Sequence, residues 1–287
     1  MFVLQRRPLG SAPSREIVAV PCDIPALAPI GCAGTSLRRM NVVDLNSDLG
    51  EGAGTDDEIM PSITSANVAC GAHAGDEATM RHTVVAAMRH GVAIGAHPGY
   101  RDPANFGRVA LDVPRDALLA DLAAQLDALR HVASAAGARL EHVKAHGALY
   151  NRGECDDAIA AVIVEAVRSF DGDLLLFAPA GSAMQRAAEP LGIRVAREGF
   201  ADRAYEPDGT LRSRRLPGSV HTDPATAAAQ AVAMARDRRV RTSDGGSLAI
   251  EVDTICIHGD TPGAVAIARA VRAALANAEI DVRPPKR

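Results

Sequence analysis

The segment DLNSDLGEG (44–52) ends an apolar, strand-like run with a cluster of polar residues. The same order of apolar run, polar cluster and helical stretch recurs along the chain. The further clusters are ANVACGAHAGD (66–76), GAHPGYRDPANFGR (95–108), HVKAHGALYN (142–151), APAGS (178–182), REGFADRAY (197–205) and CIHGD (256–260). Alternating strands and helices predict a parallel α/β fold. In an α/β barrel the loops after the strands meet at one face and form the active site, so the pattern favours an enzyme.

Seven strand-like runs can be delimited by their glycines, prolines and polar clusters. They lie near 41–46, 66–70, 92–96, 141–144, 173–177, 193–197 and 252–257. Seven such units predict an α/β barrel of seven or eight strands, although a doubly wound open sheet would show the same alternation. Asp76 is expected to cap a helix that ends at His90 before Gly91, and Thr55 with Glu58 fits a capping box.

Composition narrows the class of protein. The chain has 287 residues, of which 47% are hydrophobic, and a net charge of −4. A protein that binds nucleic acid needs a basic face, so this negative net charge argues against nucleic acid as an obligatory partner. The apolar runs are shorter than the roughly 18 residues of a membrane span. The five cysteines form no CxxC pair or even framework, so we expect reduced thiols and a cytoplasmic protein.

Residues 1–39 differ from the rest of the chain, because they contain five prolines and scattered arginines without periodicity. We interpret 1–39 as a disordered extension or as the product of a start codon placed too early. Residues 40–287 are expected to form one β/α barrel domain, since no boundary is visible after residue 40.

The first polar cluster places three polar side chains on one face of a strand. Asp44, Asn46 and Asp48 alternate, so they share one face. Barrel interiors are normally filled by branched apolar residues, and an unpaired carboxylate there is costly. We therefore favour a site role for Asp44 and Asn46. Asp48 and Glu51 fit either a site or a turn, and the sequence does not decide between them.

The fourth cluster repeats this pattern with basic groups. Lys144 stands at a strand end, where its ammonium needs an anionic substrate oxygen or a salt bridge to a neighbouring strand. We favour the functional role. His146 is ranked with Lys144, whereas His142 lies deeper and is interpreted as structural.

His73 and His97 each follow a strand in a turn that contains glycine. They fit metal ligands, general bases or hydrogen-bond donors. Asp44, His73 and His97 together are a candidate metal site, although spacing alone gives this only weak support.

The last cluster, His258-Gly259-Asp260, follows the seventh strand and precedes a helix expected from Pro262 to about Asn277. Helix N-termini attract anions, so the segment is a candidate phosphate site, while Asp260 or Thr261 as a simple N-cap is the commoner use. Arg203, with its acidic neighbours in 197–205, could hold a polar substrate or pair only with them.

These motifs resemble the LamB/YcsF family, which includes the A subunit of the bacterial ATP-dependent 5-oxoprolinase. The resemblance rests on DLNSDLGEG (44–52), SANVACGAHAGD (65–76), GAHPGYRD with FGR (95–108), HVKAHGALYN (142–151), FADRAY (200–205) and HGD (258–260). It covers about 40–285 in order. One departure is Ala145, where the family usually has proline, and this should change local stiffness more than chemistry.

The resemblance implies an irregular seven-stranded β/α barrel, TIM-like and of the glycoside hydrolase/deacetylase type. It implies hydrolysis of 5-oxoproline (pyroglutamate) to glutamate, coupled to ATP hydrolysis, with ATP and a divalent metal (Mg²⁺ with the ATP) as cofactors and with subunits B and C as partners. On this basis we expect one set of residues to orient the lactam, handle protons and neutralise phosphate charge: Asp44, His73, His97, Lys144 and His146. The expected substrate- or nucleotide-binding residues are Asn46, Asn67, Arg203, His258, Gly259 and Asp260.

Two other functions remain open from the sequence. One is a metal-dependent amide or carbohydrate deacetylase on the same barrel, although no HxxxH pair lies wholly in a loop after a strand, since His142 and His146 span a strand end. The other is a non-catalytic subunit that binds a lactam and regulates its partners.

Overall fold

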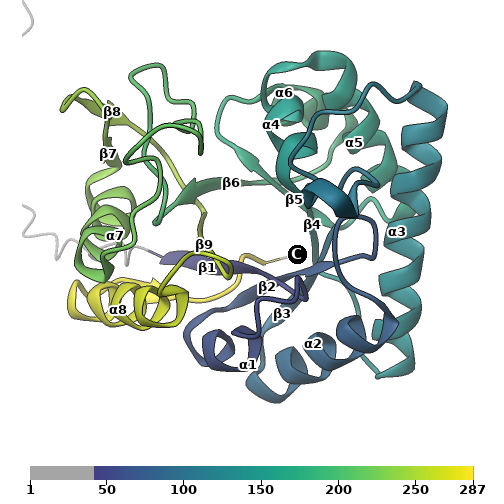
Figure 1. Cartoon of the computed structure of the whole chain (residues 1–287), viewed down its shortest axis with the longest axis horizontal. Coiled ribbons are helices and arrows are strands. Elements are labelled where there is room, and N and C mark those ends of the chain that lie inside the picture. Colours follow the sequence, from purple (N-terminus) through teal and green to yellow (C-terminus); the bar gives the residue numbers. More distant parts are fainter. Residues whose placement is uncertain (1–41, 287) are drawn as a thin grey trace, which may run out of the picture. The chain divides into compact units, whose positions relative to one another are not determined.

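Seven parallel strands close into a barrel in the computed structural model, which describes residues 42–286 (Figure 1). The barrel strands are β1 (Val42–Leu49), β2 (Ser65–Ala69), β3 (Ala93–His97), β4 (His142–Lys144), β5 (Leu175–Pro179), β6 (Val195–Phe200) and β9 (Thr254–His258). Their order follows the chain, and β9 pairs with both β6 and β1 to close the sheet. The predicted α/β barrel is confirmed and the open sheet is excluded. The interpretation of 1–39 lies outside the described residues.

Three short strands were not predicted from the sequence. β10 (Asp281–Val282) extends the barrel sheet beside the first residues of β1, and β7 (Arg239–Arg241) with β8 (Ser247–Ala249) forms a separate antiparallel hairpin. Each has only two or three residues, which is too short for a period-two pattern to stand out. The hairpin follows a π-helical turn, Ala233–Asp237, at the end of α7.

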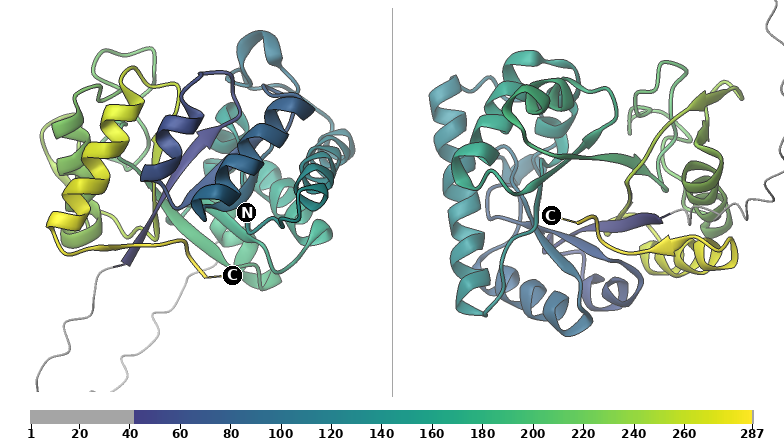
Figure 2. Two further views of the ribbon diagram at one scale, coloured as in Figure 1. Left: turned by 90° about the horizontal axis from the view of Figure 1, so that it is seen from below. Right: turned by 180° about the vertical axis from the view of Figure 1, so that it is seen from behind.

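Helices surround the barrel, and α7 packs along α8 (Figure 2). The helices are α1 (Asp56–Ile59), α2 (Glu77–His90), α3 (Arg115–Ala135), α4 (Gly147–Cys155), α5 (Asp157–Phe170), α6 (Ala183–Ala188), α7 (Pro224–Val232) and α8 (Ala264–Asn277), with 3₁₀ turns at Met60–Ser62, Pro103–Asn105 and Glu189–Leu191. The apolar stripes of α3 and α5 are buried, and each buried leucine or valine contributes about 1.5–3 kcal/mol. Within residues 42–286 no helix has the length and hydropathy needed to cross a membrane.

The predicted helix ends are partly confirmed. Asp76 accepts a hydrogen bond from the backbone N–H of Thr79, and Gly91 ends α2 with a φ of 64°. The capping box at Thr55 is wrong, because its hydroxyl donates to the backbone oxygen of Gly259 on another loop instead (3.1 Å).

The barrel interior is polar where alternate side chains of β1 face it. Val43 and Leu45 belong to the apolar core, whereas Asp44, Asn46 and Asp48 alternate with them and are buried among polar side chains of other strands. Buried polar groups are costly unless they are hydrogen-bonded, so the interior must be a connected network. That network runs toward the ends of the strands and carries the candidate site.

Candidate functional site at the C-terminal mouth of the barrel

Lys144, the last residue of β4, is the centre of a buried ionic group. Its Nζ lies 2.9 Å from Asp48 Oδ1, 2.9 Å from Glu198 Oε1 and 3.1 Å from Cys256 Sγ. Burial alone would lower the pKa of Lys144, but the negative charges of Asp48 and Glu198 hold it well above its usual value. The salt bridge that the sequence left open as the alternative for Lys144 is therefore present, and it joins three strands.

An amide network lies beside this ion pair. Asn46 Nδ2 donates to Glu198 Oε1 (3.0 Å), and Asn67 Nδ2 donates to Asn46 Oδ1 (2.7 Å) and to Asp48 Oδ1 (2.8 Å). His142 Nε2 is 2.7 Å from Asn67 Oδ1, and burial lowers the pKa of His142 to about 3, so the neutral ring donates. Asn46 and Asn67, expected to bind substrate, are fully buried and hydrogen-bonded to one another. They position Asp48 and Glu198.

Asp44 lies apart from the histidines with which it was grouped. Its carboxylate accepts hydrogen bonds from the hydroxyls of Thr64 (2.6 Å), Ser65 (2.8 Å) and Thr254 (2.6 Å). Asp44 is paired with Thr254 at the start of β9, four residues before Asp48, which is roughly 13 Å along the strand. The metal group of Asp44 with His73 and His97 is therefore not formed. Burial raises the pKa of Asp44 to about 6.

Three histidines and Glu51 meet at the mouth of the barrel. His97 is the last residue of β3, whereas His73 and His146 follow β2 and β4, and all three are almost fully buried. Glu51 Oε1 lies 3.1 Å from His73 Nε2, 3.1 Å from His146 Nδ1 and 3.7 Å from His97 Nε2. These histidines were expected at the site, and the structure brings them together with Lys144. Glu51, which the sequence left undecided, is the residue that connects them.

The end of β9 and the segment after it place another histidine, His258, beside two carboxylates. His258 Nδ1 lies 2.9 Å from Asp202 Oδ1, and its Nε2 faces Asp48 Oδ2 at 4.0 Å. Burial alone would raise the pKa of Asp202, but His258 and then Thr261 hold it at about 2. Thr261 donates to Asp202 (2.6 Å), so it is not the helix cap: α8 begins at Ala264 with Gly263 as its N-cap. The alternative of a simple N-cap at Asp260 or Thr261 is therefore wrong, whereas the phosphate site at the N-terminus of this helix stays a prediction.

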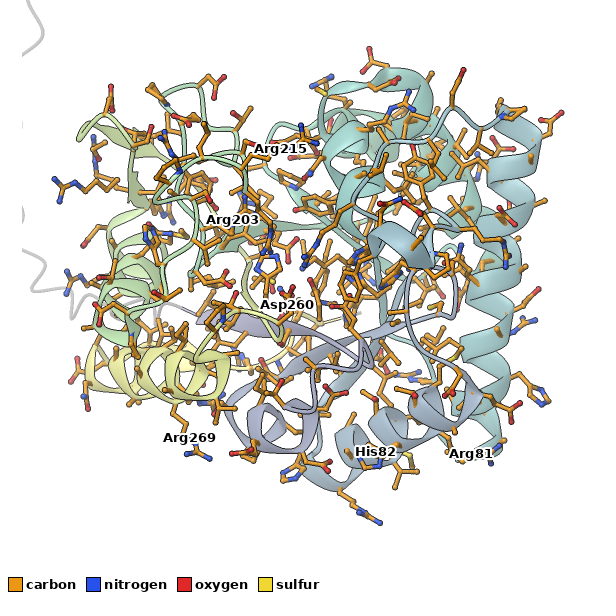
Figure 3. The ribbon with its side chains drawn as sticks, viewed as in Figure 1. Arg81, His82, Arg203, Arg215, Asp260 and Arg269 are labelled. Carbon is orange, nitrogen blue, oxygen red and sulfur yellow. The ribbon has the colours of Figure 1, made fainter. Side chains whose placement is uncertain are left out.

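The remaining expected binding residues lie around this segment. Asp260 pairs with Arg108 from the loop after β3, and a Cβ at Gly259 would lie 2.8 Å from the Asp48 backbone oxygen, so only glycine fits there. In Figure 3 the labelled Arg203 and Asp260 lie over the centre of the barrel. Arg203 donates to the backbone oxygens of Ser219 (3.2 Å) and Arg212 (2.7 Å), so it braces the loop after β6.

Two groups among the described residues have the composition and spacing to hold a metal ion. They are Glu51, His73, His97 and His146, and Asp48, Cys256 and His258. In each group the candidate ligand atoms lie within 4.8 Å of one another. The strand ends thus place acid–base groups, candidate cation ligands and a buried lysine within one mouth, and active sites are built from groups of these kinds.

Residues 43–287 match the sequence model of the LamB/YcsF family. The chain belongs to this family. It is 51% identical over 240 residues to the 5-oxoprolinase A subunit of Bordetella pertussis, covering 81% of this chain and 94% of the relative. It is 47% identical over 248 residues to the protein of the same name from Symbiobacterium thermophilum, covering 85% and 95%.

The barrel of this LamB/YcsF protein is also that of a solved relative. The crystal structure of the lactam utilization protein from Thermus thermophilus superimposes with a TM-score of 0.79 at 43% identity, covering 84% of this chain and 98% of that one. Membership and fold, both expected from the motifs, are confirmed.

Sequence reasoning did not assign roles to two acidic residues of the LamB/YcsF site. Glu198 and Asp202 come from the REGFADRAY cluster, for which the sequence leaves open whether its charged residues hold a polar substrate or pair only with each other. Their partners are Lys144 and His258, which lie 54 and 56 residues away in the chain. The nearest signal was the presence of two carboxylates directly at a strand end, the position where barrels place site residues.

Proposed function

We propose that this chain is the A subunit of an ATP-dependent 5-oxoprolinase, which opens 5-oxo-L-proline to L-glutamate while ATP is hydrolysed to ADP and phosphate. The names of relatives with 51% and 47% identity over most of both chains support this role. The observation that carries the proposal is the convergence at one barrel mouth of His258, backed by Asp202, and of Asp48, held by Lys144.

The chemistry explains why ATP is needed. A five-membered lactam resists hydrolysis, and phosphorylation of its oxygen makes the ring carbon electrophilic. The steps that remain for the protein are the orientation of the ring, the activation of water and the protonation of the departing ring nitrogen.

His258 is the best-placed group for proton transfer. Its Nδ1 is fixed by the Asp202 carboxylate, which leaves Nε2 directed toward Asp48 at the mouth. A carboxylate behind a histidine fixes the tautomer and stabilises the imidazolium that forms during proton transfer. We therefore assign general acid–base chemistry to His258, which the sequence placed among the binding residues.

Lys144 is assigned a positioning role, since both of its carboxylate partners are already in contact. Phosphate charge is met by arginines on the rim. Burial lowers the pKa of Arg203 to about 10, and the positive charges of Arg214 and Arg108 add to this effect. Guanidinium groups bind phosphate through charge-assisted hydrogen bonds, and Mg²⁺ would accompany the nucleotide. Subunits B and C are the expected partners.

The test is a reconstituted complex with pyroglutamate and ATP, in which glutamate and phosphate release are measured together. His258→Ala should lower turnover by about 10²–10⁴-fold, the usual contribution of a general acid–base group. The matched control is His131→Ala on the exposed surface of α3. Full turnover by His258→Ala, with pyroglutamate binding intact by calorimetry, would instead support a non-catalytic, lactam-binding subunit. Glutamate release without ATP would refute the coupling.

A further inference from the structure

We propose that Glu51, His97 and His146 bind one divalent transition-metal ion at the mouth of the barrel, and that His73 positions Glu51 without binding the ion. This inference goes beyond the 5-oxoprolinase proposal and does not depend on it, because it is read from the positions of the ring nitrogens and the Glu51 carboxylate. The isolated chain is sufficient for the test.

The hydrogen bonds fix which ring nitrogens are free. His97 Nδ1 lies 2.8 Å from the backbone oxygen of Lys144, and His146 Nε2 lies 2.8 Å from that of Phe106. A carbonyl oxygen only accepts, so these nitrogens carry hydrogens, and in the neutral rings His97 Nε2 and His146 Nδ1 carry the lone pairs. The two nitrogen atoms lie 3.0 Å apart, beside the Glu51 carboxylate. Such a convergence of negative atoms requires a positive charge between them.

The spacing of the three atoms suits a metal ion. The pairs His97 Nε2–His146 Nδ1, His146 Nδ1–Glu51 Oε1 and His97 Nε2–Glu51 Oε1 are 3.0, 3.1 and 3.7 Å long. A circle through three points with these separations has a radius of about 1.9 Å, and zinc bonds to nitrogen and carboxylate oxygen measure about 2.0–2.2 Å. An ion slightly out of the plane of the three atoms therefore reaches all of them without movement of the backbone.

His73 cannot share this ion with His146 in the observed arrangement. Their rings are stacked with centroids 3.6 Å apart and planes 2° from parallel. The lone pair of an imidazole nitrogen lies in the ring plane, so one ion cannot lie in both planes. His97 is nearly perpendicular to His146, at 88°, and meets no such limit. His73 Nε2 donates instead to Glu51 Oε1 at 3.1 Å and orients that carboxylate.

Each ligand therefore has a partner that fixes its orientation. The Lys144 and Phe106 carbonyls hold the two imidazoles, and His73 holds Glu51. Outer hydrogen bonds of this kind are a general property of protein metal sites. In the other candidate group the Cys256 thiol contacts the Lys144 ammonium (3.1 Å), and that positive charge opposes a cation.

The ligand set also selects the class of ion. Two imidazoles with one carboxylate suit zinc, iron(II) or manganese(II), whereas Mg²⁺ prefers oxygen ligands. Three protein ligands leave a position open for water, as in catalytic zinc sites. The uncoordinated Asp48 Oδ2, 3.5 Å from His97 Nε2, adds negative charge beside the ion.

The test is calorimetric titration of the full-length, untagged chain with Zn²⁺ after removal of metal by a chelator. Wild type should bind one ion per chain at this site, and His97→Ala and His146→Ala should lose it. His73→Ala should keep one ion with about 10–100-fold weaker affinity, the usual effect of losing an orienting partner. The control is His82→Ala, on the exposed face of α2 (Figure 3). Glu51→Gln preserves side-chain size and serves if the histidine variants do not fold.

Several outcomes would overturn the proposal. Wild-type protein that takes up no zinc would show that a proton shared by His97 and His146 supplies the positive charge. Loss of binding in His73→Ala as complete as in His97→Ala would make His73 a ligand. Equal binding by wild type and Glu51→Gln would place the ion elsewhere. None of these results depends on pyroglutamate turnover, so failure here is distinguishable from failure of the 5-oxoprolinase assignment.

Discussion

Replacing Lys144 by methionine tests the ion pairs on which the barrel interior depends. The ammonium is buried and lies 2.9 Å from both Asp48 Oδ1 and Glu198 Oε1, so the variant leaves two carboxylates without their cation. Breaking a buried pair in this way costs about 3–5 kcal/mol. Total stabilities are about 5–15 kcal/mol, so the loss is a large fraction of the free energy of unfolding.

The assay is urea unfolding followed by far-ultraviolet circular dichroism, because the chain has no tryptophan. With an m-value of about 3 kcal/mol/M, Lys144→Met should lower the midpoint by about 1–1.7 M. Lys144→Met with Glu198→Gln removes one of the stranded charges and should recover at least about 1 kcal/mol, within the range of contact couplings. The control is Lys286→Met, at an exposed position. A loss below about 1 kcal/mol, or a double variant no more stable than the single one, would refute the argument.

Three further results are expected. Asp202→Asn should lower turnover of the reconstituted complex by about 10²–10⁴-fold, since His258 loses the acceptor that fixes its tautomer; unchanged turnover would exclude the dyad. The pKa of Asp44 is raised from 3.8 to about 6, so its contribution to stability is lost as pH rises through 6. Relative to Asp44→Asn, wild type should therefore gain up to about 3 kcal/mol in urea unfolding between pH 7 and pH 4, and a gain on raising the pH would contradict this. Gly95→Ala should destabilise the fold by more than about 1 kcal/mol in the same assay, because the new Cβ overlaps the buried His142 ring. An unchanged free energy of unfolding would contradict this close packing.

The barrel was predictable because each strand ends in a glycine, a proline or a polar cluster. Closure was not predictable in the same way, since an open sheet alternates strands and helices equally well. It depends on pairing between β1 and β9, which are about 200 residues apart in the chain. The hairpin of β7 and β8 has three residues in each strand and no alternation to detect.

The site was partly predictable, because most of its residues stand at the strand ends that the sequence marks. His97, His146 and Lys144 stand at strand ends, and strand ends meet wherever the barrel closes. Asp44 was misplaced because alternation puts it on the correct face but says nothing about depth, and four residues separate it from Asp48. The partner of Lys144 on β6, Glu198, follows only from closure. A signal within the sequence was that Lys144 and Lys286 are the only lysines among 31 basic residues.

Lys144 supports two parts of the site through different atoms. Its side chain holds Asp48, whereas its backbone oxygen accepts the Nδ1 hydrogen of His97 and so directs Nε2 toward Glu51. Methionine at this position removes the first support and keeps the second. If the metal ligands are those inferred here, Lys144→Met should still bind one zinc ion while the complex loses turnover through the displaced Asp48. Joint loss of both properties in a folded Lys144→Met chain would mean that Asp48, and not the backbone carbonyl, keeps His97 in place.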